Sequence, residues 1–137
     1  MEVDEAFVDE ESEPDPALNR MTNAIIGAAI EVHRRIGPGH LESAYEAALA
    51  IEFALREIPF KRQHPVALDY KGYSIGESRL DFLVFDSIIV ELKAVETIAP
   101  IHRAVAISYL KITGHRLALI INFHVKALKD GIRRIAL

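Results

Sequence analysis

Two stretches in the first half of the chain repeat apolar residues every three or four positions, as the buried face of a helix requires. The first begins after Thr22 or Asn23, either of which can cap a helix, and it ends at Gly37-Pro38-Gly39. The second covers residues 41–57 and is closed by Pro59, which cannot continue a helix. The pattern therefore predicts two consecutive helices.

From Phe60 the apolar residues alternate with polar ones, which is typical of half-buried strands. Pro65 falls inside the first of these runs and places it at a sheet edge or at a strand start. Lys71-Gly72 is a turn signal, and Asp86-Ser87 predicts a hairpin. The predicted strands are 63–70, a short return strand 73–75, 79–85 and 88–94.

Helical spacing returns between Pro100 and Thr113, with Gly114 as the C-terminal cap. A fully apolar run at 117–122 predicts a strand that is buried on both faces. The chain then ends in a predicted helical turn and a strand around 132–135. This order of elements predicts an α/β fold with a mixed central sheet flanked by helices.

The formal net charge is −4, but the charge is distributed unevenly. Residues 1–16 contain eight of the 20 acids and no Lys or Arg, whereas residues 17–137 hold the other 12 acids and all 16 basic residues. We expect the first segment to be a disordered acidic tail, because it can bury too little apolar surface to offset its chain entropy. The tail either solvates the domain or imitates nucleic acid at a basic site. The second segment, a single domain, is net basic and can bind nucleic acid.

The chain has no cysteine, which excludes disulfides and thiolate metal sites. It also lacks the pattern of a signal peptide and any run of about 18 apolar residues. We therefore expect a cytoplasmic protein without a membrane partner.

Three charged side chains interrupt the otherwise apolar strands 79–85 and 88–94. Glu91 and Lys93 are two residues apart, so both point to one face of their strand. Asp81 lies in the preceding strand, and carboxylates are the ligands that a hard divalent cation prefers. Beside such an ion, Lys93 could orient the attacking water and stabilise charge that develops on a phosphoryl group.

This site depends on the register between the two strands. Asp81 and Glu91 share a face only if they lie directly opposite one another. A two-residue turn at Asp86-Ser87 would shift the register by one and separate them, so the site hypothesis predicts an odd-numbered loop or a bulge. The alternative interpretation is a structural salt bridge between Lys93 and one of the acids in a half-exposed strand.

The segment Gly39-His40-Leu41-Glu42-Ser43-Ala44-Tyr45 has the pattern G-x-x-E-x-x-Y. Over residues 20–137 the chain resembles the GxxExxY family of small bacterial and archaeal proteins, which is placed in the PD-(D/E)-x-K nuclease superfamily. The resemblance also includes Asp81, Glu91-Leu92-Lys93, Tyr109-Leu110-Lys111 and Ile121-Asn122-Phe123. It implies a restriction-endonuclease-like core in the order α-α-β-β-β-α-β.

The resemblance also implies site residues. Asp81 and Glu91 look like the acids that hold Mg²⁺ or Mn²⁺, Lys93 looks like the catalytic lysine, and Glu42 would reach the metal from the preceding helix. The alternative for Glu42 is a solvent-facing helix acid. The expected substrate-binding residues at the border of the site are Gln63, Tyr109, His102 and Lys111.

One position departs from the pattern of the relatives, which usually have a glutamine four residues before the helix tyrosine. Here that position is Val105, which cannot hydrogen-bond a phosphate, a nucleobase or a metal-bound water. Tyr109 itself could equally belong to the core.

Two functions are therefore considered. The first is a Mg²⁺- or Mn²⁺-dependent nuclease, an endo- or exonuclease that hydrolyses nucleic acid, with DNA favoured over RNA. The second is a catalytically inactive module that keeps the nuclease fold and binds nucleic acid or protein. A homodimer suits either function, because a domain of this size offers little surface with which to grip a duplex.

Overall fold

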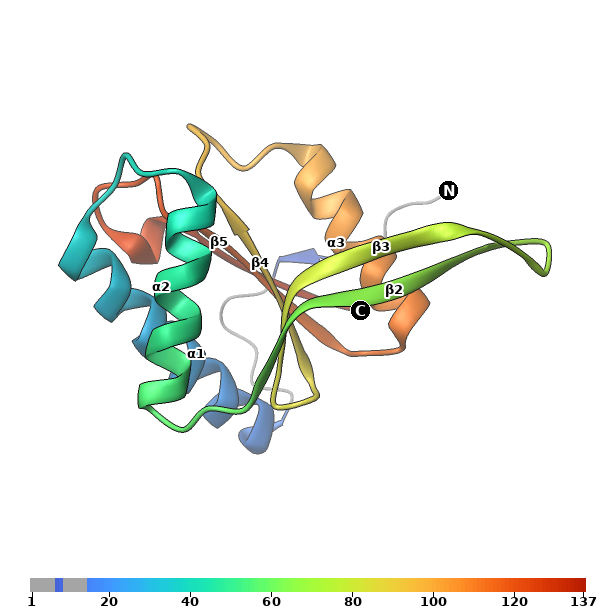
Figure 1. Cartoon of the computed structure of the whole chain (residues 1–137), viewed down its shortest axis with the longest axis horizontal. Coiled ribbons are helices and arrows are strands. Elements are labelled where there is room, and N and C mark those ends of the chain that lie inside the picture. Colours follow the sequence, from blue (N-terminus) through green and yellow to red (C-terminus); the bar gives the residue numbers. More distant parts are fainter. Residues whose placement is uncertain (1–6, 9–14) are drawn as a thin grey trace.

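The computed structural model describes residues 7–8 and 15–137, and its centre is a six-stranded sheet in the order β1-β6-β5-β4-β3-β2. Strands β4 and β5 are parallel, and the other neighbouring pairs are antiparallel. The predicted mixed α/β fold and the order of its core elements are confirmed (Figure 1). The elements are β1 (Phe7–Val8), α1 (Pro16–Ile36), α2 (Glu42–Leu55), β2 (Phe60–Tyr70), β3 (Tyr73–Val84), β4 (Ile88–Lys93), α3 (Pro100–Thr113), β5 (Leu117–Asn122), the 3₁₀ turn η1 (Leu128–Gly131) and β6 (Ile132–Ala136).

Helix α1 begins earlier than the sequence pattern predicts. Its N-cap is Asp15, whose Oδ1 accepts a hydrogen bond of 2.8 Å from the N–H of Ala17. Thr22 is buried inside the helix, where its hydroxyl donates to the carbonyl of Leu18 at 2.8 Å. The predicted cap at Thr22 or Asn23 is therefore wrong, because a threonine hydroxyl can also bond the preceding turn of a helix.

Strand β3 is continuous, whereas the sequence pattern predicts separate strands at 73–75 and 79–85. Its pairing with β2 extends to the tip of the hairpin, and the register shifts once, between Leu68 and Asp69. Gly76 has a φ of 125°, a backbone conformation that side chains other than glycine rarely adopt. This glycine lets the strand change register without ending. Helix α3 and strand β5 have the predicted bounds.

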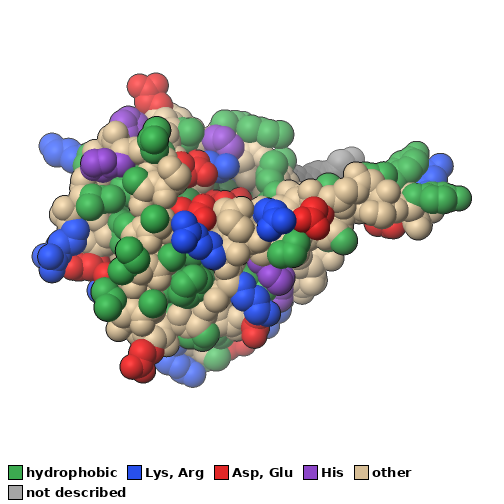
Figure 2. Space-filling model, in the orientation of Figure 1, with side chains coloured by type: hydrophobic (Ala, Val, Ile, Leu, Met, Phe, Trp, Pro, Cys, Tyr) green, Lys and Arg blue, Asp and Glu red, His purple; other side chains and the backbone are tan. Residues whose placement is uncertain are grey.

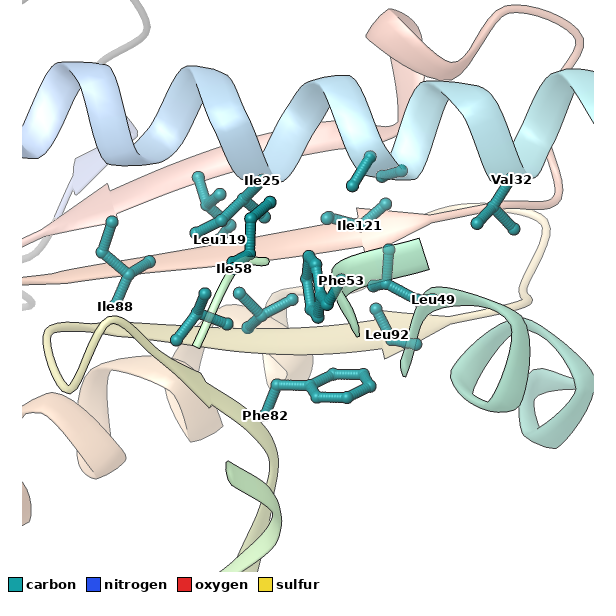
Figure 3. Packing of buried hydrophobic residues seen from close by; sticks show 14 of the residues in the cluster. Ile25, Val32, Leu49, Phe53, Ile58, Phe82, Ile88, Leu92, Leu119 and Ile121 are labelled. Carbon is teal, nitrogen blue, oxygen red and sulfur yellow. The ribbon is translucent and has the colours of Figure 1, made fainter. Parts of the chain in front are cut away.

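The side chains of β5 alternate between two hydrophobic cores, one on each face of the sheet. Leu119 and Ile121 pack with α1 and α2, whereas Ile120 packs with α3. Figure 3 shows the first core, in which the rings of Phe53 and Phe82 meet edge to face with their centroids 5.3 Å apart. Burial on both faces holds the central strands β4 and β5 rigidly, and β4 carries two of the predicted site residues.

Phe7 and Val8 lie within the segment that the sequence predicts to be disordered. The structure pairs their backbone with β6 in antiparallel fashion, which adds a short edge strand to the sheet. Helix α1 begins at Pro16, one residue before the predicted domain boundary. The rest of the disorder prediction falls on residues 1–6 and 9–14, which lie outside the described residues.

Candidate active site

The loop between β3 and β4 contains three residues, Phe85, Asp86 and Ser87. It places Val84 opposite Ile88, and the same register continues through Phe82 and Val90. Phe85 and Asp86 both have left-handed φ values, 58° and 52°, and the N–H of Ser87 donates to the carbonyl of Val84 at 3.0 Å. The ladder ends at Phe82 and Val90, and its register, continued by one residue, brings Asp81 opposite Glu91, as the site hypothesis requires.

The carboxylates of Asp81 and Glu91 lie where the ladder between β3 and β4 ends. The N–H of Asp81 donates to Oε2 of Glu91 at 3.0 Å, and the N–H of Leu92 donates to Oδ2 of Asp81 at 2.8 Å. Each strand therefore holds the carboxylate of the other through its backbone. These two hydrogen bonds replace pairing between main chains and fix both side chains at the point where the strands separate.

The electrostatic environment of these acids opposes their ionisation. Glu91 is only 8% exposed, and its pKa is raised to about 8, first by burial and then by the charge of Asp81. Burial also raises the pKa of Asp81, although the hydrogen bond from Leu92 counteracts this effect. The pKa of Glu42 is raised by burial and by the charge of Asp81. Glu91 is buried and Asp81 is half-buried, whereas Glu42 is exposed at the start of α2, as the alternative interpretation of a solvent-facing helix acid expects. The charge of Asp81 raises the pKa of both glutamates, so a cation bound near Asp81 would be favoured.

Lys93 is the last residue of β4, and its positive charge lowers the pKa of all three acids. Within residues 15–137, however, Lys93 forms no ion pair with Asp81 or Glu91. The structural salt bridge that was the alternative interpretation is therefore absent from this part of the chain. The ammonium group of Lys93 lies near the carboxylates of Asp81 and Glu91 without forming an ion pair with either.

Glu46 is a further acid of this site that the sequence analysis missed. It lies one helical turn after Glu42 on α2, and its charge raises the pKa of Glu42 and of Asp81. Arg62 donates from Nε to Glu46 Oε2 at 2.7 Å, and Gln63 donates from Nε2 to Glu46 Oε1 at 3.0 Å. The spacing of four residues between two glutamates at the start of a helix was the signal that could have identified it.

The tyrosine of the G-x-x-E-x-x-Y pattern is structural. Tyr45 is fully buried, and its hydroxyl donates to the carbonyl of Gly37 at 2.5 Å and accepts from the N–H of His40 at 3.2 Å. Its ring stacks on Phe123 with the centroids 4.4 Å apart. These contacts fix the loop that precedes α2, and with it the position of Glu42, the first residue of the helix.

The far side of the site is held by Phe123 and by the neighbouring residue Asn122. The N–H of Phe123 donates to the carbonyl of Lys93 at 2.9 Å. Asn122 is buried, and its amide accepts from the N–H of Val95 at 3.0 Å and donates to the carbonyl of Val95 at 2.8 Å. The backbone on both sides of Lys93 is therefore tied to the end of β5.

The four predicted substrate-binding residues differ in their placement. Gln63 contacts Glu46, and its hydrogen bond lowers the pKa of Asp81, so it borders the acids. The pKa of His102 is lowered by burial and by the charge of Lys93, and its Nδ1 accepts a hydrogen bond of 2.9 Å from the N–H of Ala99 at the start of α3.

The other two lie further along α3. Tyr109 is hydrogen-bonded to Ser78 of β3, with 2.6 Å between their hydroxyl oxygens, and Lys111 is exposed in the last turn of α3. Val105, where the resemblance to the GxxExxY family implies a glutamine, is 39% exposed. The structure thus groups Gln63 and His102 with the carboxylates and lysine, and it gives Tyr109 a contact with the β2–β3 hairpin instead.

The fold and the site together define an α/β domain of the restriction-endonuclease-like class, with two opposed carboxylates and a lysine where the central hairpin separates. A family model described as the PD-(D/E)XK nuclease superfamily matches residues 19–135, and the chain belongs to this superfamily. The recognition of this superfamily from the sequence is thereby confirmed.

No curated protein and no solved structure gives a significant match to the chain. The finer resemblance to the GxxExxY family therefore still rests on the sequence motifs alone. None of the helices in the described part of the chain combines the length and the apolar character that a membrane span requires.

Nucleases of this superfamily generally use divalent metal ions. The acids of this site offer the oxygen ligands that Mg²⁺ and Mn²⁺ prefer, and a bound ion would offset the burial that raises their pKa values. In residues 7–8 and 15–137, no group of three or more Asp, Glu or His side chains is already close enough to hold an ion. The donor set thus fits a hard cation in its chemistry without being preassembled around one.

Proposed function

We propose that this chain is a divalent-metal-dependent nuclease that hydrolyses phosphodiester bonds of nucleic acid. The observation that carries the proposal is that backbone hydrogen bonds across β3 and β4 hold the carboxylates of Asp81 and Glu91 where the strands separate, with Lys93 two residues further along β4. Asp81 and Glu91 would hold the metal, and Glu42 would contribute from α2. When bound, the ion would polarise a phosphoryl oxygen and lower the pKa of a water molecule.

The residues of the chain have separate tasks in this proposal. The ammonium group of Lys93 stabilises the negative charge that develops on the phosphoryl oxygens. Gln63 and Arg62 hold Glu46 in place, so that α2 and β2 keep a fixed distance beside the acids. Figure 2 shows Lys and Arg side chains next to acidic ones in the middle of the visible face, and basic side chains of this kind would attract a phosphate backbone. DNA is the first substrate to test, followed by RNA.

The test is cleavage of fluorescently labelled single-stranded DNA, duplex DNA and RNA in Mg²⁺ or Mn²⁺, with a chelator as the blank. We expect Asp81→Asn, Glu91→Gln and Lys93→Ala each to lower the rate about 100-fold or more. Asp86→Asn is the matched control, because Asp86 is an exposed acid in the same hairpin and asparagine tolerates its left-handed backbone. Absence of cleavage of every substrate by the wild-type protein would reject the proposal.

A second candidate function is a nuclease-fold module that binds nucleic acid or protein without catalysis. One feature of the sequence favours it: Val105, whose side chain cannot hydrogen-bond a substrate, stands where the resemblance to the GxxExxY family implies a glutamine. This function predicts salt-dependent binding of nucleic acid, or of a protein partner, that is unchanged by a chelator. Cleavage that depends on both Lys93 and added metal would eliminate it.

A further inference from the structure

The outer ends of β2 and β3 form a two-stranded arm, residues 66–78, that projects from the body of the protein (Figure 1). Strand β3 pairs with β4 only at residues 82–84, so within the described structure the arm has no third strand. Its base is held to α3 by the hydrogen bond between Ser78 and Tyr109. An isolated two-stranded hairpin is only marginally stable in water. A surface that packs against the arm would therefore stabilise its folded conformation.

The end of the arm is apolar. Tyr70 is 59% exposed, Tyr73 is 74% exposed and Ile75 is 62% exposed. Figure 2 shows hydrophobic side chains gathered at the end of the arm, with a basic side chain among them. Tyr70 lies opposite Tyr73, and by alternation along β2 it shares a face with Val66, which packs in the core beneath α3. The tyrosines therefore point to the same side of the sheet as α3.

Helix α3 has an apolar stripe of its own on its outer surface. Ile101, Val105 and Ile112 are 63%, 39% and 47% exposed, and their spacing of four and seven residues places them on one face of the helix. Ala106 and Leu110, on the other face, are buried against the sheet. The arm and the stripe are thus two apolar surfaces that lie next to each other and face the same way.

We propose that the chain forms a two-fold dimer in which the arm of each copy lies across the α3 stripe of the other. In a two-fold interface the same patch occurs on both subunits, so a surface must be complementary to itself. A projecting arm beside an apolar helix meets this condition, because each copy supplies one arm and one receiving surface. Packing the hairpin against the helix stripe would also bury the apolar surface that both expose in the single chain.

The charges favour contact between arm and helix over contact between two helices. Residues 100–113 contain no acid, and the exposed charges of α3 are those of Arg103 and Lys111. Two such helices side by side would repel one another. The arm contains two acids, Asp69 and Glu77, and one base, Lys71, and Glu77 pairs with Arg79 at 3.0 Å. The arm therefore has a small excess of negative charge, which favours contact with the bases of the helix.

The exposed area agrees with the size of a dimer interface. The six side chains of the arm and the stripe are 39–74% exposed and offer roughly 600 Å² of surface, taking about 150 to 250 Å² for each complete side chain. A standard protein interface buries about 800 Å² on each partner. The patch therefore accounts for most of such an interface, and exposed tyrosines are typical of its energetic centre.

Analytical ultracentrifugation of the full chain, without metal or nucleic acid, measures the dimer directly. We expect the wild-type protein to have twice the mass of the 15.3 kDa chain at micromolar concentration. Tyr73→Asp in the arm and Ile101→Asp in the stripe should each raise the dimer dissociation constant at least about 30-fold. Leu55→Asp is the matched control, since Leu55 is 74% exposed on α2, and this variant should remain dimeric. Circular dichroism spectra identical to that of the wild type establish that the variants are folded.

Mixing the two variants distinguishes a crossed dimer from other arrangements. The intact arm of Ile101→Asp can lie on the intact helix of Tyr73→Asp, so the mixture should form a heterodimer although neither variant forms a homodimer. A wild-type monomer at 100 μM would overturn the proposal. So would a dimer that Tyr73→Asp leaves intact, or a loss of nucleic-acid binding in that variant without any change in mass. Because mass is measured without substrate, the outcome is separate from the presence or absence of nuclease activity.

Discussion

Replacing Glu91 with glutamine tests whether the buried carboxylates cost the metal-free protein stability. Glutamine has nearly the same shape, and its carbonyl oxygen can still accept the hydrogen bond that the N–H of Asp81 donates at 3.0 Å. The substitution therefore removes a titratable charge and keeps the packing. Any difference in stability that depends on pH then reports the cost of ionising Glu91.

The magnitude follows from the pKa of Glu91, which is about 8 in the folded protein and 4.5 without the surrounding structure. At 1.36 kcal/mol for each pKa unit, ionisation in the folded state costs roughly 5 kcal/mol, and movement of water and side chains reduces this figure. Because the folded protein holds the proton more tightly, Glu91 contributes this stability fully below pH 4.5. The contribution is lost as the pH rises to 8.

The assay is urea unfolding of wild-type protein and Glu91→Gln in EDTA from pH 5 to pH 9. We expect the two free energies of unfolding to be similar at pH 5, and the variant to be more stable by several kcal/mol at pH 8.5. Glu52→Gln is the control, because Glu52 pairs with Arg56 at the surface of α2 and its replacement should change stability by less than about 1 kcal/mol at any pH.

Adding Mn²⁺ at pH 8.5 should narrow the difference in stability between the two proteins. A ligand at 100 times its dissociation constant stabilises the folded state by about 2.7 kcal/mol, and Glu91→Gln lacks one of the proposed ligands. A constant difference between wild type and variant from pH 5 to pH 9 would refute the burial of Glu91 beside Asp81. Equal stabilisation of both proteins by Mn²⁺ would mean that the ion binds elsewhere.

Two further substitutions test the packing around the site. Gly131→Ala should lower the free energy of unfolding in urea by about 1 to 3 kcal/mol, because the added Cβ would lie 2.2 Å from the carbonyl oxygen of Asn122. Gly27→Ala in α1 is the control, because its Cβ would meet only the end of a flexible arginine side chain at 3.3 Å. Tyr45→Phe keeps the ring on Phe123 but loses the contacts to the loop before Glu42. It should lower the rate of cleavage more than Tyr109→Phe, and equal rates in both variants would contradict a role for Tyr45 in positioning Glu42.

The sequence predicted the pair Asp81 and Glu91 only conditionally, and the reason is physical. Asp86-Ser87 is a good two-residue turn, which would have separated the carboxylates. The loop is longer because Phe85 leaves the ladder with β4, and its N–H donates to the carbonyl of Pro59 at 2.9 Å. That contact joins positions far apart in the chain, so no local pattern could select the register.

Glu46 escaped prediction for a similar reason. Its role depends on the return of β2 beside α2, which brings Arg62 and Gln63 to its carboxylate. Gln63 has a left-handed φ of 52°, an irregularity that interrupts the pairing of β2 with β3 opposite Asp81. A side chain turned out of a ladder by such an irregularity cannot be read from alternation, because alternation assumes a regular strand.

Helix α3 and strand β5 were predictable to the residue because local signals determined their ends. Pro100 can begin a helix, and Gly114 has a left-handed φ of 79° at the end of α3. Strand β5 is apolar on both faces because helices cover both sides of the sheet. The bounds of these two elements follow from residues close in the sequence, whereas the loop between β3 and β4 depends on a contact with the distant residue Pro59.

The buried strand β4 and the hairpin between β3 and β4 together explain how the fold holds acids in a place where burial disfavours their ionisation. Glu91 and Lys93 lie on β4, which pairs with β5 along its whole length, so their backbone is held by the most deeply buried part of the fold. Asp81 lies where β3 separates from β4, and the backbone hydrogen bonds of both strands retain the two carboxylates at that point. The rigid sheet thus compensates for the electrostatic cost of the acids. A cation that binds there would recover that cost, and metal binding should therefore raise the stability of the whole domain.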